Sequence, residues 1–222
     1  MVRKITAIQS QKHNSQRVNI YLEGEFAFGL ARILAAWLTV GQELSEERIA
    51  QLQADDEREV AFQKAMKFLS YRDRSEAEVR VHLAQHGVPE ALLSETITRL
   101  VKNGLISDKQ FAARWVENRT EFRPRGRRAL AYELKQKGVN QQTIDEALEN
   151  IDEVKLAYQT AHKYQAKLKA LEWLDFRKKL YAHLARRGFS YETITSTVSR
   201  VWMERQSKSN PEYETQYEEV DE

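Results

Sequence analysis

The 222-residue sequence contains no cysteine, only three prolines, and no apolar run approaching the ~18–20 residues that cross a bilayer. Without cysteine, disulfides, thiolate nucleophiles and cysteine-ligated zinc are excluded. Met1 onward shows no apolar signal segment, so we predict a cytoplasmic protein that does not enter membranes. The eight glycines form no phosphate-binding fingerprint, and no Ser, His and Asp set lies at a recognisable turn. We therefore predict no enzymatic activity, no catalytic residues and no cofactor.

Charge is distributed unevenly along the chain. Residues 206–222 carry one lysine and six acidic residues, a net charge of −5, and since the whole chain is +2, the first 205 residues carry +7. A basic body with an acidic tail suggests a polyanionic or acidic partner. A solubilising tail on an ordinary basic surface explains the same pattern equally well.

Residues 1–30 show the period-two alternation of strands. Apolar and polar residues alternate over 18–22 and again over 26–30, with Glu23-Gly24-Glu25 between them as a turn. Ile5 and Ile8 could supply a third strand. Because a lone hairpin is marginally stable in water, we expect helices over 31–38 and 46–54 to cover it, the second capped by Ser45.

From about Glu57 the chain is predicted to be helical, and a unit of roughly fifty residues occurs three times. Gly87, Gly138 and Gly188 set the register, at spacings of 51 and 50 residues. Apolar residues match at six positions around each glycine, and the four that lie nearest to it are Val79, Leu83, Val88 and Leu93; Leu130, Leu134, Val139 and Ile144; Leu180, Leu184, Phe189 and Ile194. So many matched columns indicate tandem repeats rather than chance.

Each glycine is predicted to follow a helix in the left-handed conformation, where a Cβ is costly, in a Schellman motif that leads into the next helix. A further helix precedes each pair, over about 57–70, 108–121 and 153–170. The predicted fold is mostly α, with three tandem three-helix repeats behind a small N-terminal β-hairpin and helix segment. The expected boundaries are 1–56 for the N-terminal segment, 57–106, 107–151 and 152–205 for the repeats, and 206–222 for an acidic disordered tail.

Cations gather at the start of the middle helix in the second and third copies, where the first copy has a capping box of Ser75 and Glu78. Cations in a first helical turn oppose the helix dipole, at about 0.3–1 kcal/mol each at low salt. Free N–H groups together with several cations form an anion site. We predict a partner- or anion-binding surface made of Arg114, Arg119, Arg123, Arg125, Arg127, Arg128, Arg177, Lys178 and Lys179. The alternative is a solvated charged face.

Two other sets of residues have competing interpretations. His82 and His86 have the i, i+4 spacing of a metal pair, but the repeat columns supply no third ligand, so we predict ordinary histidines and no metal site. The four tryptophans could be stacking platforms for nucleic-acid bases. Since each lies within an apolar helical stripe, we favour core packing for them.

Several short motifs occur in a fixed order along the repeats. They are Arg74-Ser75-Glu76, Gly104-Leu105-Ile106-x-Asp108-x-x-Phe111-Ala112, Glu133-Leu134-x-x-Lys137-Gly138-Val139 and Arg187-Gly188-Phe189. As a set, over about residues 60–200, they resemble the RecX family of bacterial recombinase regulators. Residues 14–30 resemble the N-terminal hairpin of its longer members. Pro124, among arginines, and the acidic tail depart from the family pattern.

The resemblance implies three tandem three-helix repeats and no catalytic residues. It implies binding along the groove of RecA filaments on single-stranded DNA, and we expect the protein to bind as a monomer. There it would modulate, and by our prediction inhibit, ATP hydrolysis, strand exchange and co-protease activity in DNA repair, recombination and the SOS response. The alternative is a helical-repeat nucleic-acid-binding protein without a recombinase partner. An enzyme is the third and least favoured class.

Overall fold

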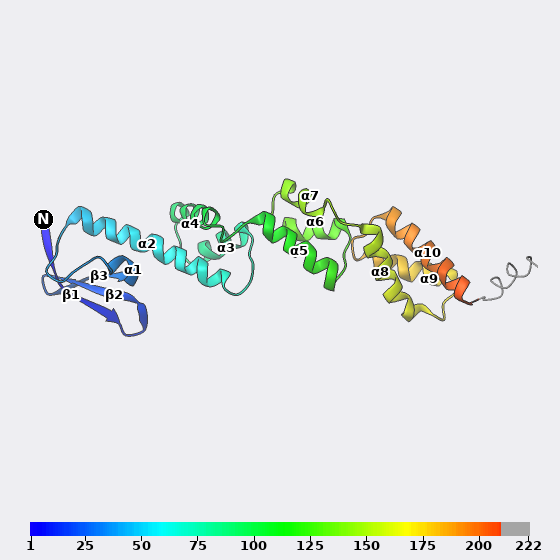
Figure 1. Cartoon of the computed structure of the whole chain (residues 1–222), viewed down its shortest axis with the longest axis horizontal. Helices are drawn as coiled ribbons and strands as arrows, with labels where there is room; N and C mark the ends of the chain where they lie inside the picture. The colour runs from blue at the N-terminus through cyan, green and yellow to red at the C-terminus, as the bar shows by residue number, and fades with distance from the viewer. Residues whose placement is uncertain (210–222) are drawn as a thin grey trace, which may run out of the picture. The chain divides into compact units, whose positions relative to one another are not determined.

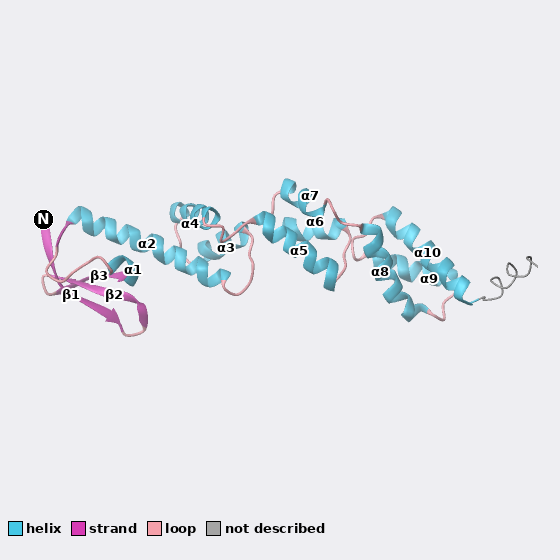
Figure 2. Ribbon diagram, viewed as in Figure 1, coloured by secondary structure: helices cyan, strands magenta, loops and turns pink. Residues whose placement is uncertain are grey.

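The computed structural model describes residues 1–209, and its contacts divide the chain into two units, Met1–Ser107 and Asp108–Glu222. The first unit contains a small sheet and four helices, and the second is built from helices alone in its described part (Figures 1 and 2). This confirms the predicted fold class of tandem three-helix repeats behind an N-terminal segment with strands. The predicted acidic tail lies outside the described residues from position 210 onward.

The N-terminal sheet is antiparallel, with the strand order β3-β2-β1-β4. Its strands are β1 (Val2–Gln11), β2 (Asn14–Leu22), β3 (Glu25–Ala31) and β4 (Glu43–Ser45). The predicted hairpin is confirmed: Glu23 and Gly24 make its turn with φ of 50° and 89°. Ile5 lies on the third predicted strand and is fully buried beside Ile20 and Leu22. β4 was not predicted, because three residues are too short to show an alternation.

The helices of the N-terminal segment differ from the expected ranges. α1 spans only Arg32–Ala35, and α2 (Glu46–Leu69) is one continuous helix in place of the two expected over 46–54 and 57–70. The predicted break near Asp55 is wrong, because no glycine or proline interrupts the sequence there and the polar stretch continues the helix. Ser45 caps α2 as predicted, since its Oγ accepts a hydrogen bond from the Arg48 N–H. α2 therefore belongs both to the N-terminal segment and to the first repeat.

Asp56 joins the sheet to α2. It is 8% exposed, and its carboxylate accepts hydrogen bonds from both Nη atoms of Arg17 on β2 and from the Ala31 N–H at the end of β3. We expect Asp56→Ala to lower the free energy of unfolding by about 2–3 kcal/mol, because it leaves a half-buried guanidinium and a buried N–H unpaired. Urea denaturation measures this, with Asp55→Ala as control. A similar loss in both variants would contradict the assignment.

Each repeat consists of three helices. They are α2, α3 (Glu76–Gln85) and α4 (Glu90–Lys102) in the first; α5 (Asp108–Phe122), α6 (Arg127–Gln136) and α7 (Gln141–Leu148) in the second; α8 (Glu153–Gln165) with the 3-10 turn Ala166–Leu168, α9 (Trp173–Ala185) and α10 (Tyr191–Ser209) in the third. The matched leucines Leu83, Leu134 and Leu184 are fully buried in three separate cores.

The glycine turns have the predicted Schellman geometry. Gly87, Gly138 and Gly188 have φ of 73°, 77° and 78°. In the first repeat, the Gly87 N–H donates to the Ala84 carbonyl at 3.0 Å and the Val88 N–H donates to the Leu83 carbonyl at 3.1 Å. Equivalent bonds close the other two turns. The turn therefore fixes the angle between the second and third helices of every repeat.

The second and third repeats lie within one unit and meet backbone to backbone. The Gly126 N–H, just before α6, donates to the Arg187 carbonyl at 2.9 Å. A Cβ on Gly126 would overlap the Gly188 carbonyl group, and a Cβ on Gly188 would lie 2.5 Å from the Cβ of Ala129. Both glycines are therefore required by this close approach, in addition to the left-handed conformation at Gly188.

Candidate partner-binding surface

The first turn of α6 contains two arginines, as predicted, and no acidic residue. Its N-cap position is Gly126, which has no side chain to cap the helix, and a carboxylate from α8 takes over this role: Glu153 accepts a hydrogen bond from the Arg127 N–H at 2.9 Å. The Arg127 guanidinium in turn donates to the carbonyls of Glu149 and Ile151 at 3.1 and 2.8 Å. In the described structure, the anion at this helix start thus comes from the chain itself.

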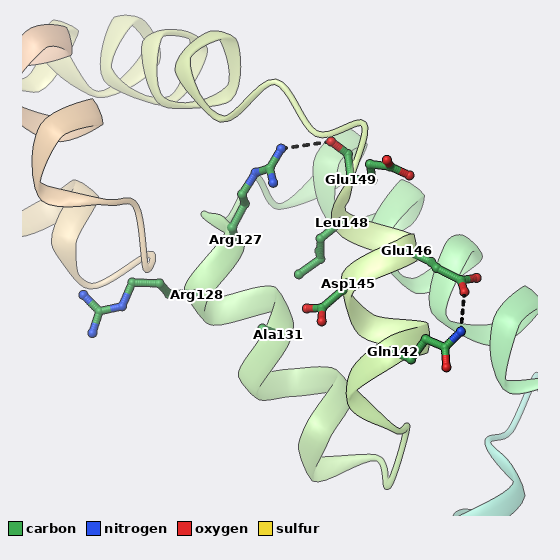
Figure 3. A pocket seen from close by; sticks show the side chains of 8 residues that line it. All are labelled: Arg127, Arg128, Ala131, Gln142, Asp145, Glu146, Leu148 and Glu149. Atoms are coloured by element: carbon green, nitrogen blue, oxygen red, sulfur yellow. Dashed lines mark hydrogen bonds between the residues drawn. The ribbon is translucent and has the colours of Figure 1, made fainter.

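Arg127 and Arg128 therefore differ in their surroundings. Both line a cleft of about 870 Å³ between α6 and α7, whose other wall contains Asp145, Glu146 and Glu149. Figure 3 shows Arg127 extending toward Glu149, while Arg128 extends away from these carboxylates. Within residues 1–209 the Arg128 side chain forms no hydrogen bond or ion pair, and Arg128 is exposed. Of the two, Arg128 is the cation available to a partner.

Arg119 and Arg125 share one carboxylate. Glu133 on α6 lies 2.8 Å from the Arg119 Nε and 3.0 Å from the Arg125 Nε, and it also accepts a hydrogen bond from the Trp115 indole at 2.9 Å. The Arg119 guanidinium lies over the Trp115 ring, 4.4 Å from its centroid. Two cations on one anion leave a net positive charge. These half-buried groups also hold α5 and its following loop against α6.

The cations of the third repeat do not lie in a first helical turn, which corrects the expected position. α9 begins at Trp173, so Arg177, Lys178 and Lys179 come one turn later, and the first turn contains Asp175. All three are exposed and have no side-chain ion pair within the described residues. Arg114 is exposed on α5. Arg123 is exposed after α5 and lines a second cleft together with cations that the sequence pattern did not reveal.

The two histidines and three of the four tryptophans have the ordinary packing roles that the sequence predicted. His82 stacks on Phe68 with centroids 3.9 Å apart, and burial foremost, then His86 and Arg74, lower its pKa. No group of three potential metal ligands occurs within residues 1–209.

Trp115, Trp173 and Trp202 pack partly buried against the repeat cores, whereas Trp37 is 87% exposed, so core packing is wrong for that residue. α1 ends at Ala35, before the apolar stripe reaches Trp37.

Family models match all parts of this architecture in order. The N-terminal domain of regulatory protein RecX matches residues 3–45, and the first, second and third three-helix domains of RecX match residues 61–100, 107–148 and 151–198. The chain belongs to the RecX family. In the described part of the chain, none of the helices has the length and apolar composition that a membrane crossing requires.

Individual RecX proteins are similar over most of their length. Regulatory protein RecX of Bacillus licheniformis is 35% identical over 87% of this chain and 76% of its own, and that of Bacillus velezensis is 33% identical over 94% and 81%. A crystal structure of regulatory protein RecX matches with a TM-score of 0.70 and 28% identity over 86% of this chain and 96% of its own. RecX is thus a family of regulatory proteins, and its name implies regulation of RecA.

Proposed function

We propose that this chain is an inhibitor of the RecA recombinase. It would bind as a monomer along the groove of the RecA filament on single-stranded DNA and lower ATP hydrolysis, strand exchange and co-protease activity. The observation that carries the proposal is the set of exposed cations on a tandem-repeat scaffold. Arg123 and Arg128 belong to the second repeat and Arg177, Lys178 and Lys179 to the third, and all five are exposed without a side-chain ion pair among the described residues.

Several modest contacts suit a repetitive partner such as a filament. Exposed charge pairs contribute roughly 0–1 kcal/mol each, so no single arginine suffices. Contacts on two linked repeats add through effective concentration, because the second binding event is intramolecular once the first has formed. The proposal therefore requires a partner that offers acidic groups at several positions.

A titration with two partners tests the proposal. We expect the protein to bind RecA-coated single-stranded DNA at least about tenfold more tightly than bare DNA at physiological salt, since the filament supplies more simultaneous contacts. Fluorescence anisotropy of labelled DNA, with and without RecA and a non-hydrolysable ATP analogue, measures the ratio. Equal affinity for both would support the nucleic-acid-binding alternative, with a salt slope of about −0.7 per phosphate contact.

A further inference from the structure

A second cleft opens beside Arg123, within the C-terminal unit. It has a volume of about 380 Å³ and lies between the end of α5 with its following loop, α8 with its 3-10 turn, and the C-terminal end of α9. This volume falls within the roughly 300–1,000 Å³ of typical ligand sites. The cleft differs from the one between α6 and α7 in that none of its lining residues is acidic.

Four cations line the cleft, from three segments of the chain. Arg123, Lys163 and Lys167 are exposed, and within residues 1–209 their side chains form no ion pair or hydrogen bond. Arg187, the fourth, is half-buried after α9. Cations gathered in a concave site without counterions repel one another and favour an anionic ligand. The arginine guanidinium matches the oxygens of a phosphate in particular.

A neutral histidine holds Arg187 in place. The His183 ring stacks on Tyr164 with centroids 3.6 Å apart, and the Arg187 Nε donates to the His183 Nε2 at 3.0 Å. Burial foremost, followed by Arg187, Arg186 and Lys167, lowers the pKa of His183 to about 4. The imidazole is therefore a neutral acceptor at physiological pH. It fixes the Arg187 Nε and leaves both Nη groups for a ligand.

We propose that this cleft binds the phosphodiester backbone of a single-stranded nucleic acid. Phosphates would lie on Arg123, Lys163, Lys167 and Arg187. Phe122, which lines the cleft and is 67% exposed, would stack against a base. This exposed ring favours a nucleic acid over an acidic peptide, which has no flat base to place there. The inference deepens the proposed function, since it gives the chain a direct contact with the single-stranded DNA inside the filament.

Bare DNA tests the cleft separately from the filament. In the full chain, Lys163→Gln with Lys167→Gln should weaken binding of labelled oligothymidylate about tenfold and reduce the magnitude of the salt slope by about 1.4, from two lost phosphate contacts. The matched control, Lys155→Gln with Lys169→Gln, removes two exposed lysines of the same stretch that do not line the cleft. It should change the affinity less than twofold. Equal losses in both pairs would overturn the proposal.

Two further measurements probe the geometry. Phe122→Leu should weaken binding of oligothymidylate but not of an abasic strand of the same length. The oligonucleotide should also raise the pKa of His183, followed by NMR, because phosphates offset the cations that lower it. Overturning results are an unchanged pKa, or a synthetic peptide of residues 210–222 that binds more tightly than DNA. Because RecA is absent, these outcomes do not depend on whether the chain prefers the filament.

Discussion

Gly188→Ala is expected to lower the free energy of unfolding by about 3–5 kcal/mol, whereas Gly87→Ala, at the equivalent turn of the first repeat, lowers it by about 1–2 kcal/mol. Both glycines have a left-handed backbone, with φ of 78° and 73°, so both substitutions carry the same conformational cost. Only at Gly188 does the new Cβ also meet another element, the start of α6 at Ala129, whereas nothing lies within 4 Å of a Cβ on Gly87.

Thermal or urea denaturation of the two variants measures the difference. Gly87→Ala is the internal control, because this substitution carries the same backbone cost as Gly188→Ala without the steric overlap. Equal destabilisation at the two positions would show that the second and third repeats do not meet as closely as the structure places them. Hydrogen exchange should also locate the added loss at Gly188 in α6 and the turn after α9, and not in the first repeat.

Reversing Arg127 and Arg128 to Glu together is expected to abolish inhibition of RecA's DNA-dependent ATPase, and the single variants should separate two causes. Arg128→Glu removes an exposed cation and should reduce inhibition roughly three- to tenfold with an unchanged melting temperature. Arg127→Glu removes two hydrogen bonds to the carbonyls of Glu149 and Ile151 and brings a second carboxylate near Glu153. It should lower the unfolding free energy by about 1–3 kcal/mol.

ATPase assays at several protein concentrations, with melting curves of the same samples, distinguish these outcomes. Lys135→Glu is the control, since Lys135 is exposed on α6 outside the predicted surface. Undiminished inhibition by a folded Arg128→Glu protein would remove Arg128 from the binding surface. A reduced melting temperature for Arg128→Glu would show instead that its role is structural.

Local patterns predicted the repeats well because each repeat packs its own core and closes its own glycine turn. The Schellman turns, the capping box at Ser75 and the buried columns of Leu83, Leu134 and Leu184 all depend on neighbours within about a dozen residues. The strands of the hairpin were visible for the same reason. β4 and the continuity of α2 were missed, because a three-residue strand has no period and a charged helical surface resembles a linker.

The candidate surface was predicted only in part, because its electrostatics depend on residues distant in sequence. Nothing near Arg127 in the sequence indicates that Glu153 will cap its helix. The sequence likewise does not indicate that Glu133 forms ion pairs with both Arg119 and Arg125. The residues of the second cleft are scattered from Phe122 to Arg187 and meet only after the third repeat has folded. A run of charges identified the region, but not which charges are available.

The cap that Glu153 gives to α6 also constrains the order of synthesis. The first repeat contains its own cap for α3, at Ser75, so this helix start is capped before translation reaches the second unit. The second repeat emerges incomplete, because the N–H groups at the start of α6 donate to Glu153 and to the Arg187 carbonyl, which are synthesised later. A nascent chain paused before Glu153 emerges would therefore present α6 uncapped, within reach of chaperones and proteases.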